Sequence, residues 1–151
     1  IHYLITNIDK LNNFARMVRG IATKGTIFYY TTMSGRAVLE LLGEADEWKS
    51  YQNNVLKYHI VKKFKGDTLA DMGQTIATKM PFSDELYEEN LVNIDFVNEL
   101  LSKRGFALKA SGSFSSFLNA YKETNKITYD ALTPDDKKFV SLYHYCRFEV
   151  L

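Results

Sequence analysis

The 151-residue sequence contains a single cysteine, Cys146, and only two prolines. One cysteine cannot form an internal disulfide, and such usage is typical of a reducing compartment. No apolar run approaches the roughly 18 to 20 residues that a membrane-spanning helix needs, and the first residues lack the features of a secretory signal. We therefore expect a soluble protein of the cytoplasm, or of the host cytoplasm if the source is a virus.

A net charge is almost absent as well, because 19 basic residues are balanced by 18 acidic ones. No global field attracts the protein to nucleic acid or to a membrane, so an electrostatic partner must be recognised locally. Length and a hydrophobic content of 46% predict a single globular domain over residues 1–151. Abundant Lys, Asn and Ile fit an AT-rich genome, such as that of a low-GC bacterium, a phage or another virus, and composition does not choose among them.

Apolar periodicity and capping residues predict the elements along the chain. Strands are expected at 3–6, 26–33 and 106–110, with a further strand at the C-terminus. The segment 26–33 is apolar on both alternating faces, which is typical of a central strand covered on both sides. Helices are expected to begin near Asn7, Ser34, Ala45, Asp67, Asn93, Ser111 and Thr133. Residues 56–60 also alternate like a strand, although a helix is favoured there.

This pattern predicts an α+β fold with a small, mainly antiparallel sheet packed by about six helices. Two segments, beginning at Asn7 and at Asn93, share the order helix, strand, Ser-Gly and helix. If that repeat is real, a three-layer α/β sheet is the alternative. Because Asn caps and Ser-Gly turns are common, chance similarity also explains it.

The two Ser-Gly corners are the first candidate binding site. Unpaired N–H groups at a helix start attract anions, and neighbouring cations can add charge-assisted bonds. The candidate ligand-binding residues are Thr32, Ser34, Gly35, Arg36, Lys109, Ser111, Gly112 and Ser113. Plain helix capping is the alternative interpretation, and neither corner matches a known phosphate-binding glycine motif.

A basic segment with interleaved aromatics is the second candidate site. Its residues are Lys57, Tyr58, Lys62, Lys63, Phe64 and Lys65. Lysines contact phosphates and aromatic rings stack on bases, so this composition indicates nucleic acid or a protein partner. A helix end with solvated lysines and core aromatics would produce the same pattern.

Catalytic and metal-binding signals are weak. The pair His144-x-Cys146 supplies too few ligands for zinc and does not have zinc-site spacing, so we expect no metal site. Tyr58 and Glu40 are the only candidates for proton transfer. The sequence does not identify a cofactor, leaves open whether the protein is an enzyme, and does not define its oligomeric state.

Two functions remain. The favoured hypothesis is a binding or regulatory module that engages nucleic acid or a protein partner through the basic-aromatic segment. The alternative is a small enzyme or small-molecule binder that holds an anionic ligand, a nucleotide or phosphorylated metabolite, at the two Ser-Gly corners. Whether Ser34 and Ser111 meet in space decides between them.

Overall fold

The computed structural model describes residues 1–151 and contains two antiparallel sheets. The first has the strand order β1 (Ile27–Met33), β7 (Tyr143–Val150) and β6 (Phe106–Ser113). Since β7 is antiparallel to both neighbours, β1 and β6 run parallel to each other. The second sheet follows the sequence order: β2 (Glu47–Gln52), β3 (Val55–Lys62), β4 (Thr75–Lys79) and β5 (Tyr87–Asn90).

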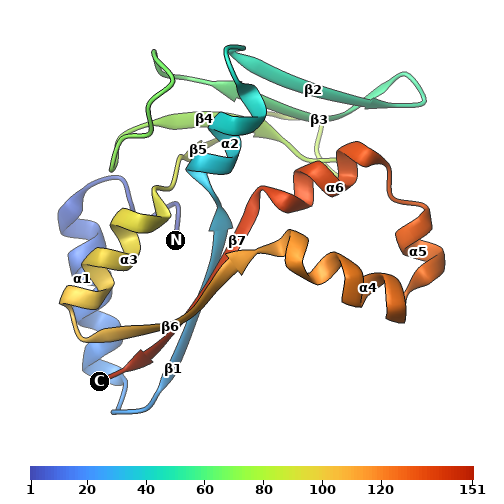
Figure 1. The fold of residues 1–151 in the computed structure, drawn as a ribbon. Helices are drawn as coiled ribbons and strands as arrows, with labels where there is room; N and C mark the ends of the chain where they lie inside the picture. Colours follow the sequence, from blue (N-terminus) through green and yellow to red (C-terminus); the bar gives the residue numbers. More distant parts are fainter.

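Helices lie at both ends of the molecule (Figure 1). α1 (Ile8–Ile21) and α3 (Ile94–Lys103) are at one end. At the other end are η1 (Phe114–Phe117), α4 (Leu118–Thr124), α5 (Lys126–Asp130) and α6 (Pro134–Ser141). α2 (Gly35–Leu42) follows β1 and leads to the second sheet. None of these helices combines the length and the apolar character needed to cross a membrane.

Capping residues begin several helices where the sequence predicts them. The side chains of Asn7 and Asn93 accept hydrogen bonds from the backbone N–H groups of Lys10 and Phe96. Thr133 forms a capping box with Asp136 at the start of α6. Each cap satisfies a backbone donor that the helix leaves unpaired.

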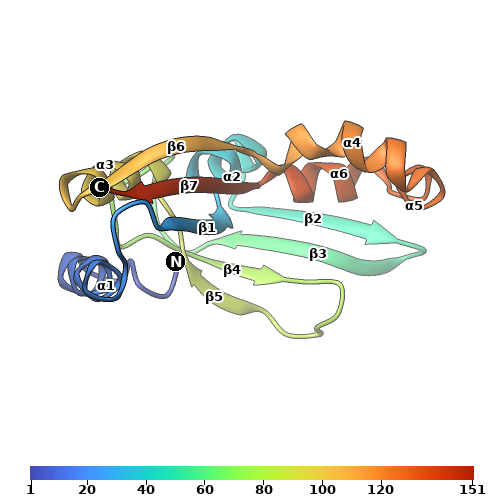
Figure 2. The same ribbon diagram turned by 90° about the horizontal axis from the view of Figure 1, so that it is seen from below.

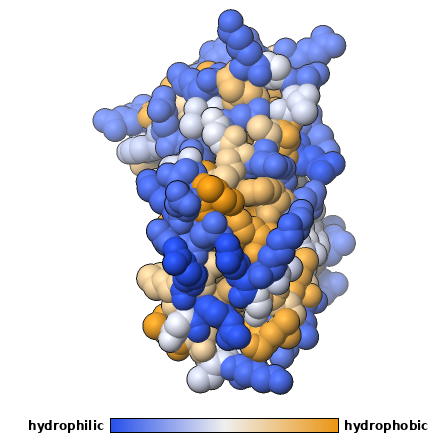
Figure 3. Space-filling view, turned by 90° about the vertical axis from the view of Figure 1, so that its left-hand side faces the viewer, coloured by the Kyte–Doolittle hydropathy of each residue, from blue (hydrophilic) through white to orange (hydrophobic).

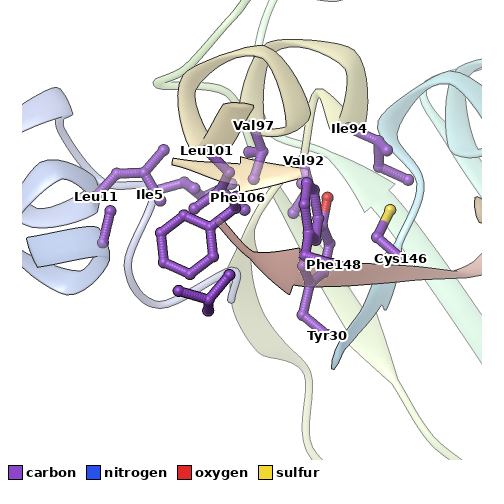
Figure 4. Packing of buried hydrophobic residues seen from close by; sticks show 12 residues of the cluster. Ile5, Leu11, Tyr30, Val92, Ile94, Val97, Leu101, Phe106, Cys146 and Phe148 are labelled. Atoms are coloured by element: carbon purple, nitrogen blue, oxygen red, sulfur yellow. The ribbon is translucent and has the colours of Figure 1, made fainter. Parts of the chain in front are cut away.

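One face of the first sheet packs against α1 and α3 (Figure 4). Leu11 of α1 and Val97 of α3 meet Tyr30, Phe106 and Phe148 of the sheet in one apolar cluster. The surface on the side of α1 and α3 is mainly hydrophilic with an apolar area near its middle (Figure 3). A cavity of ≈630 Å3 lies on this side, and its apolar lining comes from Ile8, Phe96 and Leu100.

A second apolar cluster joins the second sheet to α2 and α6. It contains Val38 of α2, Tyr58 and Ile60 of β3, and Phe139 of α6. The rings of Tyr58 and Phe139 are stacked with centroids 4.2 Å apart. α6 therefore connects the second sheet to β7, which follows it in the chain.

The predicted α+β class is confirmed, but three predicted elements are wrong. Residues 3–6 form turns rather than a strand, and only Ile5 among them is buried. The helix expected from Ala45 is the β2–β3 hairpin, so residues 56–60 do form a strand. The helix expected from Asp67 is a loop that leads into β4.

The position of β1 also differs from the prediction. It is an edge strand whose only partner is β7, not a central strand covered on both sides. Its burial alternates, and Tyr29 is 60% exposed. The apolar residues on the outer face of β1 caused the wrong prediction. No helix or strand of residues 1–151 covers that face.

Candidate functional site

The carboxyl ends of β1 and β6 meet at one edge of the first sheet. Thr32 of β1 and Ser113 of β6 both lie opposite His144 of β7 in the strand register. In sheets with parallel strands, ligands bind in the crevice outside the carboxyl ends of those strands. This edge is therefore a candidate ligand-binding site.

A cavity of ≈220 Å3 lies at this edge, and we call it the serine pocket. Both predicted corners converge on it: Ser34 and Arg36 come from the first corner and Ser111 from the second. The full lining is Ser34, Arg36, Leu69, Asn93, Ile94, Asp95, Ser111 and His144. Sequence reasoning missed the contributions of Asp95 and His144, although Asn93-Ile94-Asp95 repeats the pattern of Asn7-Ile8-Asp9.

Polar contacts within the serine pocket are local. The Arg36 guanidinium lies 3.0 Å from Asp95 Oδ2, with both side chains largely exposed. Ser111 Oγ lies 2.8 Å from His144 Nε2. Burial lowers the pKa of His144, and the charge of Asp95 opposes this only partly. Near neutral pH the pocket thus offers hydroxyls and an uncharged imidazole to a polar ligand.

The remaining predicted ligand residues have structural contacts. The Thr32 hydroxyl donates to the Met33 carbonyl oxygen at 3.4 Å. The Lys109 ammonium lies 3.2 Å from a Glu149 oxygen. Ser111 and Gly112 lie within β6 rather than at a helix start, and it is Ser113 that caps η1. The second corner is therefore a strand end, which corrects the expectation of a helix N-terminus there.

The basic-aromatic segment does not form a free cationic surface. Its first residues belong to β3, where Lys57 lies 2.7 Å from Asp136 Oδ1 and Lys62 lies 3.2 Å from Asp46 Oδ1. Lys62 also lies over the Phe64 ring at 5.9 Å. Lys63 and Lys65 follow the strand and have no ion pair.

The two weak catalytic candidates lie outside the serine pocket. The Tyr58 hydroxyl is buried and donates to Asp136 Oδ1 at 2.8 Å, and burial raises its pKa. Glu40 is exposed on α2 and lines a different, open cavity. Neither side chain is placed to move a proton in the serine pocket.

A second polar group, which we call the Glu89 group, consists of His2, Thr78, Glu89 and Tyr143. The Thr78 hydroxyl donates to Glu89 Oε1 at 3.0 Å and fixes the carboxylate on β5. The Asn90 amide donates to the His2 carbonyl oxygen at 2.9 Å. Pairing of β4 with β5 brings Thr78 and Glu89 together, and the only local signal for it in the sequence is an acidic run.

Burial and charge make the Glu89 group distinctive. Burial lowers the pKa of His2, and the nearby Glu89 carboxylate opposes this. Burial and the same carboxylate raise the pKa of Tyr143. The Nε2 atom of His2 is buried with no hydrogen-bond partner. An orphaned buried nitrogen beside a half-buried carboxylate is costly unless a ligand or water satisfies it.

No three His, Cys, Asp or Glu side chains are grouped to hold a metal ion. Cys146 is fully buried, 3.5 Å from Ser111 Oγ. Its environment is that of a core thiol rather than a reactive one.

No family model matches the chain. Among curated proteins, it is similar to the mRNA-capping enzymes of African swine fever virus. The enzymes of two isolates, Tick/South Africa/Pretoriuskop Pr4/1996 and Warthog/Namibia/Wart80/1980, are each 34% identical to this chain over 96% of its length. The chain spans only 17% of the length of these relatives. Their source is a virus, which is one of the sources that the composition allowed.

Two solved methyltransferases share its fold. An S-adenosylmethionine-dependent methyltransferase from Clostridium acetobutylicum superimposes with a TM-score of 0.54 at 13% identity, over 99% of this chain and 54% of that one. The CcbJ methyltransferase from Streptomyces caelestis gives 0.55 at 11% identity, over 100% of this chain and 58% of that one.

These relatives and structural neighbours are enzymes. The favoured hypothesis, a binding or regulatory module acting through the basic-aromatic segment, is therefore wrong. Its physical basis fails as well, because acidic partners neutralise Lys57 and Lys62. The alternative hypothesis, a small enzyme with a nucleotide-type ligand, agrees better with the comparisons.

Proposed function

We propose that this chain is part of an mRNA-capping enzyme and forms the nucleotide-binding side of a methyl-transfer site. The observation that carries the proposal is the 34% identity to viral capping enzymes over almost the whole chain. The fold shared with two methyltransferases supports methyl transfer as the proposed step. A viral capping enzyme is also consistent with the predicted location in the host cytoplasm.

The Glu89 group has the chemistry to bind the guanine base of a cap. A carboxylate accepts hydrogen bonds only, and guanine presents N–H donors along one edge. The Glu89 carboxylate, held by Thr78, is placed to accept them. Tyr143 belongs to the same group and Tyr3, which is 72% exposed, follows His2, so aromatic rings are available for base stacking.

The methyl donor of the first structural neighbour is S-adenosylmethionine, and the residues present here do not fit it. A nucleotide cofactor needs open glycine backbone at a strand-to-helix junction. A Cβ at Gly35 would lie 2.6 Å from a Leu69 side-chain atom and 2.7 Å from the Val92 carbonyl oxygen. At Gly112 it would lie 3.1 Å from the Tyr145 ring. Protein atoms thus pack closely against both glycines beside the serine pocket, and no step is assigned to the donor within this chain.

Within this proposal, the chain binds and orients the RNA 5′ end. Glu89 accepts from the base, and His2 Nε2 gains the hydrogen-bond partner that it lacks in the free protein. Burial keeps His2 uncharged near neutral pH, so its nitrogen contributes a neutral hydrogen bond.

Replacement of one carboxylate tests the proposal. In the full-length capping polypeptide that carries this chain, Glu89→Gln preserves size but replaces one acceptor oxygen with a donor. We expect cap-dinucleotide binding to weaken by about 10- to 100-fold, the range of 1–3 kcal/mol for one lost bidentate contact. Titration calorimetry with GpppG measures this.

Two variants are compared with it. Glu88→Gln alters the exposed neighbour on the same strand and should leave binding unchanged. Arg36→Ala alters the serine pocket, whose role in binding is still a prediction. If Arg36→Ala weakens GpppG binding and Glu89→Gln does not, the serine pocket is the nucleotide site. If neither variant matters, the proposed nucleotide-binding role is wrong.

A further inference from the structure

The outer edge of β1 carries unpaired backbone groups. The N–H of Val150 donates to the Thr26 carbonyl and the N–H of Ser34 donates to the Leu142 carbonyl, so even-numbered positions bond toward β7. Antiparallel pairing alternates along a strand. The N–H and C=O groups of Ile27, Tyr29 and Thr31 therefore point away from β7, and no other strand pairs with β1 on that side. Figure 2 shows β1 and β6 on opposite sides of β7.

The face of the first sheet opposite α1 and α3 is open and partly apolar. Ile27 is 39% exposed and Tyr29 is 60% exposed, and both lie on this face of β1. Arg147 lies opposite Tyr29 in the register, and its Nε atom is buried without a hydrogen-bond partner. A free strand edge beside an exposed apolar face is a liability that folded proteins normally cover.

The direction of α1 indicates what covers the free edge of β1 and the open face of the first sheet. The segment before α1 lies near the carboxyl end of β1, because the His2 carbonyl oxygen accepts from the Asn90 amide and Val92 bridges to Ser34. α1 ends close to Gly25, whose N–H donates to the Val150 carbonyl oxygen at the start of β1. It thus runs antiparallel to β1 while packing on the covered face of the sheet. A helix in this arrangement follows a strand parallel to β1, and the right-handed crossover rule places that strand next to β1.

Similar proteins are longer than this chain, and their additional polypeptide is a source for such a strand. The chain covers 54% and 58% of the two methyltransferases that share its fold, and 17% of the capping enzymes. The glycine corners in these residues do not fit the methyl donor. The donor site and the missing strand can therefore belong to the same additional half of the fold.

We propose that the free edge of β1 pairs with a parallel strand of a cofactor-binding half, supplied by polypeptide outside residues 1–151. Helices of that half cover Ile27 and Tyr29, and its strands extend the sheet beyond β1. The occupant is this half-domain and not a second copy of the chain. The inference rests on the methyltransferase part of the proposed function.

Amide hydrogen exchange in the full-length capping polypeptide tests the pairing without any nucleotide. The N–H groups of Phe28 and Tyr30 bond to β7 and serve as internal references. We expect Tyr29 and Thr31 to exchange at least about 100-fold more slowly than an unpaired amide, as a central strand requires. Rapid exchange at Tyr29 and Thr31 beside slow exchange at Phe28 and Tyr30 overturns the proposal.

A proline variant tests the same edge independently. Thr31→Pro removes an outward N–H but none of the hydrogen bonds to β7, and proline is tolerated on a free edge strand. We expect it to abolish the protection of Tyr29 and to reduce methyl transfer at least about tenfold, whereas Thr31→Ala, which keeps the N–H, should retain both. Equal behaviour of Thr31→Pro and Thr31→Ala contradicts the proposal.

Two further measurements separate the remaining explanations. Protection of Tyr29 that rises with protein concentration, together with a dimer in light scattering, means that a second copy occupies the edge and overturns the proposal. Glu89→Gln should leave the protection of Tyr29 unchanged. A failure of nucleotide binding at the Glu89 group is therefore distinguishable from a failure of strand pairing at β1.

Discussion

Asp136 connects α6 to the second sheet through a single buried carboxylate. Its oxygens accept hydrogen bonds from the Tyr58 hydroxyl at 2.8 Å and the Thr133 backbone N–H at 2.9 Å, and the Lys57 ammonium lies at 2.7 Å. Burial alone would raise the pKa of Asp136, but these hydrogen bonds outweigh it and lower the pKa to about 2. The ionised form therefore stabilises the fold.

The pH dependence of stability follows from this shift. The pKa of Asp136 is about 2 in the folded protein against 3.8 ordinarily, so its contribution is complete above pH 4 and is lost as the pH falls toward 2. We expect Asp136→Asn to lower the free energy of unfolding by about 2 kcal/mol at pH 7, with a shrinking effect below pH 4. Urea unfolding across this range measures it.

Asp135→Asn is the matched control on the same helix. Asp135 contacts only Lys138, at 3.4 Å and near the surface, so its replacement should cost less than about 0.5 kcal/mol. Equal destabilisation by the two variants at every pH would show that Asp136 has no special role.

At the scale of elements, the helix starts could be predicted from local capping residues, but the pairing of strands could not. Asn7, Asn93 and Thr133 cap helices through contacts within three residues, so the sequence alone located those helix starts. The β2–β3 hairpin was missed because Trp48 and Tyr51 recur at helical spacing. Strand pairing overrode that periodicity, since the alternating burial of a hairpin depends on residues further along the chain.

The turn of this hairpin uses two residues with left-handed backbone conformations. Asn53 and Asn54 have φ angles of 52° and 63°, as in the type I′ turns that match the twist of paired strands. Asn54→Val should destabilise the protein by about 1–2 kcal/mol, because a β-branched residue is strained at positive φ. Thermal unfolding checks this, and Asn54→Gly should be neutral or stabilising. A neutral Asn54→Val would contradict the assigned turn.

At the scale of the whole molecule, the sequence predicted three strands of the first sheet but not their order. β1 and β7 are far apart in the chain, and no local pattern shows which strands pair. The sequence left open whether Ser34 and Ser111 lie close together. In the structure both line the serine pocket. The Glu89 group could not be predicted, because it needs the β4–β5 pairing and the turn at His2 together.

The open face of the first sheet provides a test at this scale. Tyr29 on β1 and Tyr51 on β2 are both 60% exposed in residues 1–151, so Tyr51 is a control with the same exposure as Tyr29. If the open face is covered in the longer polypeptide that we propose, Tyr29→Asp should destabilise that polypeptide by about 2 kcal/mol or more through burial of a charge. Tyr51→Asp should cost far less. Similar melting temperatures for the two variants would contradict the covered face.

The same face leaves the prediction of one domain over residues 1–151 untested. If a second half pairs with β1, these residues are one part of a larger domain. Their two apolar clusters would then be joined by a third on the far side of the first sheet.

The strand order also has a consequence for synthesis on the ribosome. β2 to β5 pair with their neighbours in sequence, so the second sheet can form while translation continues. β1 must wait for β7, the last strand within residues 1–151, before its inner edge finds a partner. Among these residues the first strand made is thus the last to be paired, and nascent chains arrested before Tyr143 should be especially prone to chaperone capture and aggregation.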